Sequence, residues 1–588
     1  MIAPLYTSLL LAAPALVGPV DEPLISIWID DLGAMSQNPK DAALMRAMEM
    51  MPARVMELRE EVPLLAEMPP AALEIALHAM SGRKSLRVFE GGSDSPLPLG
   101  MQLEFQEGDA TSAREFGASV TGFMAGSGAP LSEADASGMR NLETPMGVPI
   151  QLGTQDDRFI VAMGSPASEA GKPMTMGLPE GARPVMSMDM QLGRLLEFGL
   201  EMASMGSPEE ADAAMGFMDA LGLYDLRMQM SIGADEEWLY STASWPGYVE
   251  SLRAMGSMPA RGLTAADLAR VPDDAIWAVL STWNASGTVN VLANMPEFQA
   301  AFGGDPLDAL TAVTGFDLRA EFLDHFGSVV ALYASESTGG GGMMSMVALM
   351  ELTDSEGMLE TIERVSDLIV GLGMAEADGY VGIRSWEHQG ADLFTLAFPG
   401  LPVPGEPTLA VADGHLIFGM TPQATLAAIS QMGSGSAGLA DHPRFRESVP
   451  ADIEGALALS FNDTPALARS GYGMISMMGS SVANGMRSRG DDPREAGLVV
   501  PLYHDLVDGA HASVTVTRIE GENLVQRGRA DSSILVNMAG LAGGLQSNPM
   551  AMALLGSMFF TAQETSSMSF PLEEQWDVHP EHEHGEDW

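Results

Sequence analysis

The sequence has no cysteine and very little lysine. Without cysteine the chain cannot form disulfides, thiolate-bound zinc sites, iron–sulfur clusters or thiol nucleophiles. Lysine occurs only at Lys40, Lys84 and Lys172, and 29 basic residues face 79 acidic ones, for a formal net charge of −50. A field of this sign repels phosphate backbones, so we expect no nucleic-acid partner and no electrostatic docking on anionic membranes. We interpret the charge as the hydrated, soluble surface of an acidic protein.

The first 20 residues carry no charged side chain and resemble a secretory signal peptide. The run from Leu9 to Val17 is typical of an apolar h-region, and Ala13-Pro-Ala15 offers an A-x-A cleavage site. A basic n-region is missing, since the first basic residue is Lys40, and a buried N-terminal helix is the alternative interpretation. We expect residues 1–20 to be a signal peptide and the protein to be exported, either periplasmic or extracellular.

A second uncharged stretch, residues 532–563, is interrupted by Gln546-Ser-Asn-Pro549 and by several glycines. It therefore favours two short packed helices over one helix that spans a membrane. We expect no integral membrane span in the mature chain.

The chain contains strand-like segments in the same order twice. With 46% hydrophobic residues over 588 positions, it has enough apolar material for two or more domains. The matched segments are 25–29 with 275–280, 85–89 with 328–332, 101–105 with 346–350, 158–163 with 415–420, 185–190 with 456–461, and 227–231 with 513–517. Ser165-Pro166 and Thr421-Pro422 also match, since each combines an N-cap hydroxyl with proline at the first helical position. The sequence predicts a tandem duplication with insertions in surface loops.

Alternating apolar and polar residues in these segments indicate half-buried antiparallel strands. Amphipathic helices lie between them, and the clearest, at 355–372, is preceded by a capping-box pattern of Thr353 and Glu356. We predict an α+β fold of two tandem homologous halves, each a mostly antiparallel sheet with helices packed on one face. The predicted boundaries are 21–255 for the first repeat, 256–268 for a linker, 269–540 for the second repeat, and 541–588 for a C-terminal helical segment with an acidic, histidine-containing tail.

The order of elements, the export-like N-terminus and the strand–turn–helix at Thr421-Pro422 together resemble a family of exported bacterial proteins of unknown function. The resemblance extends over most of both halves, but its motifs are loose. It implies an α+β fold and no catalytic residues.

Methionine is abundant, at 45 residues, and gathers in short clusters. The clusters lie at 45–51, 186–190, 343–346 and 474–478. Thioethers are soft ligands that suit Cu(I), so copper binding is one hypothesis. Met186, Met188 and Met190 alternate like core-facing strand residues, and leucine and phenylalanine stand at the matched positions of the second copy. We therefore favour core packing, with methionine in place of leucine and isoleucine.

Three histidines near the C-terminus are the candidate metal ligands. His579, His582 and His584 stand among acidic residues and would hold Zn²⁺, Ni²⁺ or Cu²⁺ loosely. A solvated tail without metal is the alternative, and the one we favour.

Other motifs lack a required feature. Residues 133–144 resemble an EF-hand loop, but Thr144 stands where the bidentate glutamate is needed. Gly433-Ser-Gly-Ser-Ala-Gly438 fits G-x-G-x-x-G but follows a predicted helix, so we interpret it as a loop. Adjacent acids such as Asp30 and Asp31 point to opposite faces of a strand. We therefore predict no catalytic residue, no cofactor-binding residue and no cofactor.

These observations favour an exported, non-enzymatic binding or scaffolding protein of the bacterial cell envelope. We expect its partner to be an apolar small molecule such as a lipid, or another envelope protein. A metal-buffering protein that uses the methionine clusters or the histidine tail is the alternative hypothesis, and an unrecognised hydrolase is a third. An apolar groove would favour a carrier, exposed clustered thioethers a metal-binding protein, and filled cores a scaffold.

Overall fold

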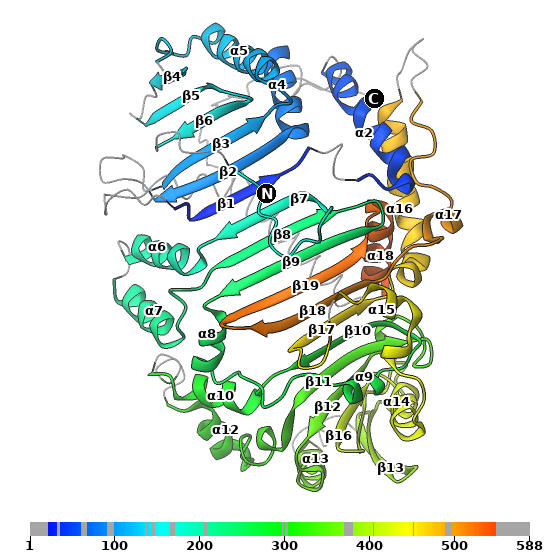
Figure 1. Ribbon diagram of the computed structural model, residues 1–588. Coiled ribbons are helices and arrows are strands. Elements are labelled where there is room, and N and C mark those ends of the chain that lie inside the picture. Colours follow the sequence, from blue (N-terminus) through cyan, green and yellow to red (C-terminus); the bar gives the residue numbers. More distant parts are fainter. Residues whose placement is uncertain are drawn as a thin grey trace, which may run out of the picture.

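A single sheet of 19 strands is the frame of the molecule, and every neighbouring pair of strands in it is antiparallel (Figure 1). The computed structural model describes residues 22–547 apart from 32–35, 60–67, 91–98, 136–137, 144–147, 165–170, 205–207, 297–298, 300–303, 370–379, 404, 451 and 488–494. The predicted α+β class is confirmed. The predicted signal peptide lies outside the described residues.

The N-terminal half supplies nine strands and the C-terminal half supplies ten. The first set is β1 (Ile25–Ile29), β2 (Arg83–Glu90), β3 (Leu99–Gln106), β4 (Met139–Glu143), β5 (Pro149–Gln155), β6 (Arg158–Met163), β7 (Arg183–Met190), β8 (Met228–Ala234) and β9 (Trp238–Pro246). The second set is β10 (Ala275–Thr282), β11 (Phe326–Ser335), β12 (Val347–Leu352), β13 (Gly382–His388), β14 (Ala391–Ala397), β15 (Thr408–Ala412), β16 (His415–Gly419), β17 (Ala458–Asn462), β18 (Ser513–Glu520) and β19 (Asn523–Asp531). Every segment matched in the sequence overlaps one of these strands.

Both sets have their strands in corresponding spatial order. From the outer edge inward, the first set runs β4-β5-β6-β3-β2-β1-β7-β8-β9. The second set runs β14-β15-β16-β12-β11-β10-β17-β18-β19, with β13 added outside β14. Each pair of segments matched in the sequence occupies corresponding places in these two orders.

The two sets meet at one pair of strands, β9 and β19, which we call the seam. Its register runs from Trp238 opposite Asp531 to Pro246 opposite Asn523. Thr242 and Arg527 lie opposite each other at its midpoint, and exchanging the two strands about that point preserves the register. In Figure 1 the orange strands β18 and β19 lie directly beside the green strands β8 and β9.

Helices lie at both ends of the strands, with α2, α16, α17 and α18 on one side of Figure 1 and α6, α7, α8 and α10 on the other. Within the part of the chain that the structure describes, none of them is both long and apolar enough to cross a bilayer. The helices of the N-terminal half are the short η2 (Pro39–Asp41), α2 (Ala42–Leu58), α4 (Pro70–Ser81), α5 (Ala110–Gly126), α6 (Leu192–Ser204), α7 (Pro208–Ala220) and α8 (Tyr248–Ala254). Those of the C-terminal half are α9 (Ala265–Ala269), α10 (Ala285–Asn294), α12 (Pro306–Thr314), η3 (Leu323–His325), η4 (Met343–Ser345), α13 (Ser355–Ile369), α14 (Pro422–Ser434), η6 (Leu439–Asp441), α15 (Pro443–Ser448), α16 (Thr464–Met486), α17 (Tyr503–Val507) and α18 (Ile534–Ser547).

Helices pack against both faces of the sheet in the C-terminal half. Ile417 of β16 lies in the main core with Ala428 of α14, whereas the neighbouring Leu416 packs with Met358 of α13. Successive strand residues point to opposite faces, so α13 and α14 cover opposite sides. The prediction of helices on one face was wrong here, because β16 carries apolar residues at successive positions and both of its faces are buried.

The sheet face beneath α14 changes character at the seam. In the C-terminal half a row of directly paired residues on this face is apolar: Val516, Leu459, Leu280, Ala331, Leu349 and Ile417. Across the seam the row continues as Arg527, Thr242, Ser231, Ser187, Trp28, Ser85 and Glu104. The same face is thus an apolar core in one half and a mostly polar but buried face in the other.

Two helix starts test the predicted caps. At α14 the Thr421 hydroxyl accepts the N–H of Ala424 at 3.2 Å, so that cap is confirmed. At α13 the carboxylate of Asp354 accepts the N–H of Gly357 at 3.0 Å. Thr353 precedes this cap, and its hydroxyl instead donates to the carbonyl of His325 at 3.1 Å. The capping box predicted from Thr353 was therefore wrong by one residue.

The segment between the halves, residues 256–268, is anchored to the second half. Leu263 is fully buried in the main core. Arg261 donates to Asp267 at 2.7 Å and to Glu351 of β12 at 2.8 Å. Burial alone would raise the pKa of Asp267, but hydrogen bonds from Arg261 and Thr264 lower it to about 2.

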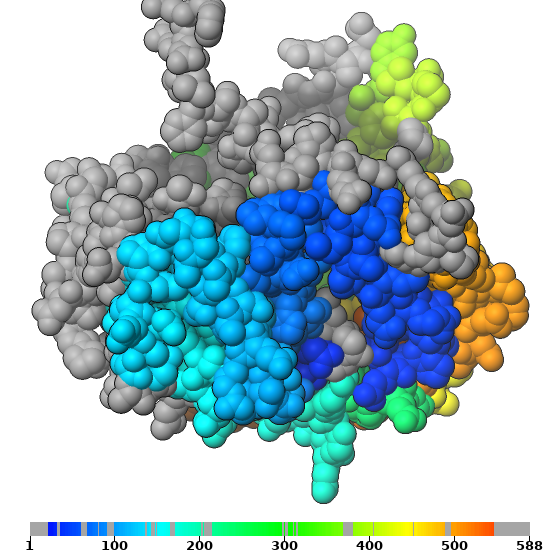
Figure 2. Space-filling view, turned by 90° about the horizontal axis from the view of Figure 1, so that it is seen from above, coloured from blue at the N-terminus to red at the C-terminus, as the bar shows by residue number. Residues whose placement is uncertain are grey.

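The N-terminal helix α2 packs against helices near the end of the chain. Ala47 of α2 shares a small core with Ala483 of α16 and with Val499. Figure 2 shows this contact from above, where dark blue surface lies beside orange surface.

Asp41 is fully buried next to α2 and caps α18 instead of its own helix. Its carboxylate accepts the hydroxyl of Ser533 at 2.8 Å and the N–H groups of Ile534 and Leu535 at 2.7 and 3.0 Å. The first N–H groups of a helix have no partner within the helix. Asp41 lies 492 positions before Ser533 in the chain and nevertheless caps the N-terminus of α18, the last described helix.

Candidate functional site

The predicted metal ligands His579, His582 and His584 lie outside the described residues, so the structure does not test them. The methionines of β7 are placed, and their predicted orientation was wrong. Val185 and Ser187 are the buried residues of that strand, whereas Met186 and Met188 are half-buried on the opposite face. The cause is local, since the backbone of Met174 covers Ser187 and donates its N–H to the hydroxyl at 3.0 Å.

The methionines of α16 differ from those of β7 because two of them face solvent. Met477 is 66% exposed and Met478 is 45% exposed, while Met474 packs against the core between α16 and α18. Residues three and four positions apart share one helix face. The three thioethers therefore gather on one side of α16.

The EF-hand-like segment 133–144 and the glycine motif 433–438 are predicted loops, and each is a loop only in part. In the first, Met139–Glu143 form strand β4. Residues 133–135 lie between the end of α5 and the start of β4, and the Asp135 carboxylate accepts the N–H of Met139 at 3.0 Å. The G-x-G-x-x-G motif at residues 433–438 begins inside α14. Its Gly435 ends that helix in the left-handed conformation, with φ 60°.

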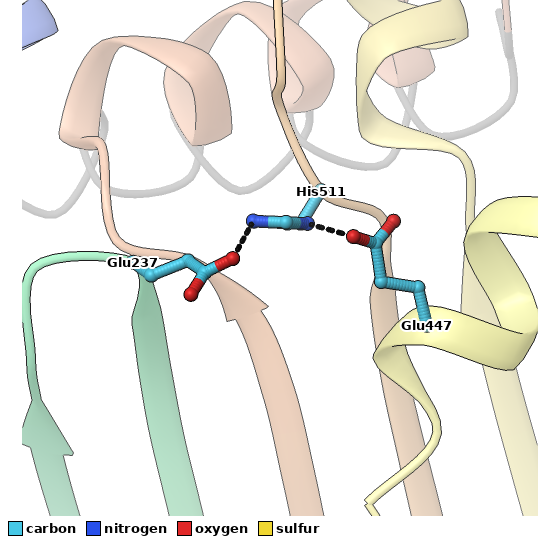
Figure 3. Close-up of side chains that lie close together, drawn as sticks. All are labelled: Glu237, Glu447 and His511. Carbon is cyan, nitrogen blue, oxygen red and sulfur yellow. Dashed lines mark ion pairs between the residues drawn. The ribbon is translucent and has the colours of Figure 1, made fainter.

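The clearest group of titratable side chains lies at one end of the seam and consists of Glu237, His511 and Glu447 (Figure 3). The His511 ring lies between the two carboxylates. Its Nε2 atom is 3.3 Å from Oε1 of Glu237, and its Nδ1 atom is 3.6 Å from Oε1 of Glu447. Glu237 precedes β9, His511 precedes β18, and Glu447 lies on α15. We call this group the seam cluster.

Surrounding residues fix the seam cluster in place. The His511 ring stacks on Trp238 with centroids 3.9 Å apart, and its backbone N–H donates to buried Asp531 at 2.9 Å. Asp235 accepts the N–H of Glu237 at 3.0 Å, which orders the turn before β9. Trp238 and Asp531 are the paired residues at the end of the seam.

In the seam cluster each nitrogen of one imidazole lies beside a different carboxylate. A neutral imidazole donates from one nitrogen only, so the lone pair of the other would face a carboxylate. His511 is 7% exposed, and its Nδ1 atom makes no hydrogen bond. A cation bound at this nitrogen would remove the conflict.

A second charged group is buried on the polar face of the N-terminal half. Glu104 is 2% exposed and pairs with Arg87 and, at 3.2 Å, with Arg158. It also accepts the side-chain amide of Gln102 at 2.9 Å and the N–H of Gly171 at 3.2 Å. Buried charges persist in proteins when partners neutralise them. Here four donor groups surround the Glu104 carboxylate.

A small polar cavity of about 130 Å³ lies nearby, lined by Ser26, Lys172, Ser187 and Arg227 among others. Arg227 donates to Asp189 at 2.7 Å, and this hydrogen bond raises the pKa of the guanidinium. The cavity is lined by two cationic side chains, Lys172 and Arg227, and by the acids Glu22 and Asp189.

Sequence reasoning did not find the seam cluster, because its members are single residues far apart in the chain. Comparison of the chain with models of protein families, with curated proteins and with solved structures gives no match. The function therefore has to be argued from the geometry alone.

Proposed function

We propose that this protein is an exported, non-enzymatic scaffolding or binding protein of the bacterial cell envelope. The observation that carries the proposal is the way the interior is filled. In the C-terminal half, Tyr333, Phe445 and Phe461 are at most 2% exposed within the main core. In the N-terminal half the same sheet face carries the buried Glu104 network. Because these interiors are packed with side chains, a partner would bind to the outer surface of the protein.

We further propose that the two halves are copies of one ancestral unit and that the chain belongs with exported α+β proteins of unknown function. The corresponding strand orders support the duplication, because equivalent strands occupy equivalent positions in the two halves although the loops between them differ in length. The register-preserving pairing of β9 with β19 is the one that two identical subunits would form about a two-fold axis. In this proposal the seam preserves the interface of an ancestral dimer.

The partner that fits best is another envelope protein. Large exposed apolar side chains gather in the α16–α18 region: Met477, Met478, Leu498, Leu502 and Leu541. Exposed apolar groups of this kind mark interaction surfaces. A lipid is the weaker candidate, since a cavity of about 380 Å³ is lined by Asn284, Ser286, Ser328 and Thr353 beside its apolar residues.

Fractionation with native mass spectrometry tests export and partner binding together. We expect the chain in the envelope fraction, with its N-terminus near residue 16 and without a stoichiometric lipid. A photo-crosslinking residue at Leu498 or Leu541 should capture a discrete protein partner, and the same residue at exposed Leu196 should not. A cytoplasmic chain that begins at Met1, or a lipid retained at one per chain, would refute the proposal.

The exposed thioethers of α16 support a second candidate, a Cu(I)-buffering protein. Met477 and Met478 with Met474 would supply three soft ligands from one helix face. Competition of the full chain with a chromophoric Cu(I) chelator tests this candidate. Binding no tighter than micromolar, or binding unchanged in a Met477→Leu/Met478→Leu variant, would eliminate it.

A further inference from the structure

We propose that the seam cluster binds a divalent transition-metal cation and that this ion links the two halves of the protein. The ligands would be one imidazole nitrogen of His511 and the carboxylates of Glu237 and Glu447. The inference is independent of the scaffolding proposal, because it rests on three side chains and not on the outer surface.

The spacing of the ligand atoms suits such an ion. One ligand atom from each of the three residues lies within 4.8 Å of the other two. The Nδ1 atom of His511 lies 3.6 Å from Oε1 of Glu447, whereas the 3.3 Å contact of Glu237 is with the other ring nitrogen, Nε2. Two ligands bound to a tetrahedral Zn²⁺ at its usual bond lengths are roughly 3.3 Å apart. The side chains of Glu237 and Glu447 are 64% and 53% exposed, so they have room to rotate, and Glu237 has to turn from the Nε2 side of the ring toward Nδ1 to share an ion there.

The buried nitrogen is the second, independent observation. His511 is 7% exposed, and its Nδ1 atom lies beside Glu447 without a hydrogen bond. A buried polar atom without a partner destabilises the fold, and a bond to a cation would satisfy it. Stacking on Trp238 and the anchor to Asp531 hold the ring in the orientation that such a bond needs. Histidine ligands are commonly held in this way by neighbouring groups.

The charges also favour a cation. A neutral His511 with two carboxylates carries a charge of −2, which a divalent cation neutralises. The nearby Arg529 stacks on Trp238, and its guanidinium carbon lies 4.9 Å from the centroid of the Trp238 ring. Imidazole with carboxylates suits Zn²⁺ and related transition metals, whereas Mg²⁺ prefers oxygen ligands alone.

The position of the seam cluster gives the ion a structural role. Glu237 belongs to the N-terminal half, and His511 and Glu447 belong to the C-terminal half. The ion would sit where Trp238 and Asp531 end the seam and would hold its two sides together.

Zn²⁺ binding to the full chain tests the inference. The background is a variant with His579→Ala, His582→Ala and His584→Ala, which removes tail binding. After treatment with EDTA and desalting, calorimetry with Zn²⁺ should show one tight site per chain, and Zn²⁺ should raise the melting temperature. Mg²⁺ should not displace it. Co²⁺ should give the visible absorption of a site with nitrogen and oxygen ligands.

Substitutions of the exposed carboxylates locate the site without disturbing the core. Glu237→Gln and Glu447→Gln should each weaken Zn²⁺ binding by about 10- to 100-fold. Glu236→Gln is the matched control, because it removes an exposed acid from the same turn and should leave binding unchanged. Equal Zn²⁺ affinity in the Glu447→Gln and Glu236→Gln variants, or no tight site in the background chain, would overturn the inference.

Discussion

Replacement of Asp41 by alanine should loosen the contact between the first and last described helices. The Asp41 carboxylate accepts hydrogen bonds from Ser533, Ile534 and Leu535 at the start of α18. It also accepts the hydroxyl of Ser36. In the variant, two buried backbone N–H groups at the helix start lose their acceptor.

The expected loss follows from these contacts. Loss of a helix cap costs about 0.5–2 kcal/mol, and each buried donor left without an acceptor adds about 1–3 kcal/mol. Because neighbouring groups relax, we expect Asp41→Ala to lower the free energy of unfolding by about 3–5 kcal/mol. Asp41→Asn retains an oxygen acceptor but loses the charge, so we expect a loss of about 1–2 kcal/mol.

Urea denaturation followed by circular dichroism measures the difference in stability, and hydrogen exchange with mass spectrometry locates it. Peptides from α18 and from the start of α2 should exchange faster in the Asp41→Ala variant, whereas peptides from β4 to β6 should not change. Local opening of this kind precedes global unfolding.

Glu49→Ala is the matched control, because Glu49 is an exposed acid on α2. It should change stability by less than about 0.5 kcal/mol. If Asp41→Ala behaved like this control, or if the exchange of α18 did not change, the carboxylate would not be the cap that the geometry indicates.

Three further predictions concern packing and charge. Gly543→Ala should cost about 1–3 kcal/mol in urea denaturation, because a Cβ there would lie 1.8 Å from the carbonyl oxygen of Leu467, while Gly544→Ala, with nothing within 4 Å, should cost far less. Glu104→Gln should cost about 3–5 kcal/mol, because its arginine partners lose their counter-charge, and a thermal melt that did not shift would contradict this. Asp267 has its pKa lowered from 3.8 to about 2, so its contribution of about 2 kcal/mol is fully present above the unfolded pKa. That contribution is lost as the pH falls from about 3.8 through about 2, and Asp267→Asn should flatten the acid limb of the stability curve over that range.

The sequence allowed the strands at the centre of each half to be predicted because their apolar residues alternate. The outer strands escaped notice for a physical reason. β13 is an edge strand whose Arg384, Ser385 and Glu387 are exposed, and β4 at the other edge carries Arg140. Polar side chains protect an edge from other chains, and they also remove the periodicity that reveals a strand.

The seam cluster and the Asp41 cap could not be predicted because neither has a local signature. His511 is joined to Glu237 only when β9 pairs with β19, and Asp41 reaches α18 only when the two ends of the fold meet. The orientation of Met186 was mistaken because burial on β7 is decided by a covering loop and not by the strand's own pattern.

The pairing of β9 with β19 has a consequence for refolding. While β19 is still unfolded, β9 presents an open row of backbone donors and acceptors that the β9 or β19 of another molecule can also occupy. Covalent attachment gives the chain's own β19 an effective concentration near the millimolar range, so the correct partner wins in dilute solution. Concentrated refolding removes that advantage, and the expected by-product is a domain-swapped dimer in which two chains share two such strand pairs.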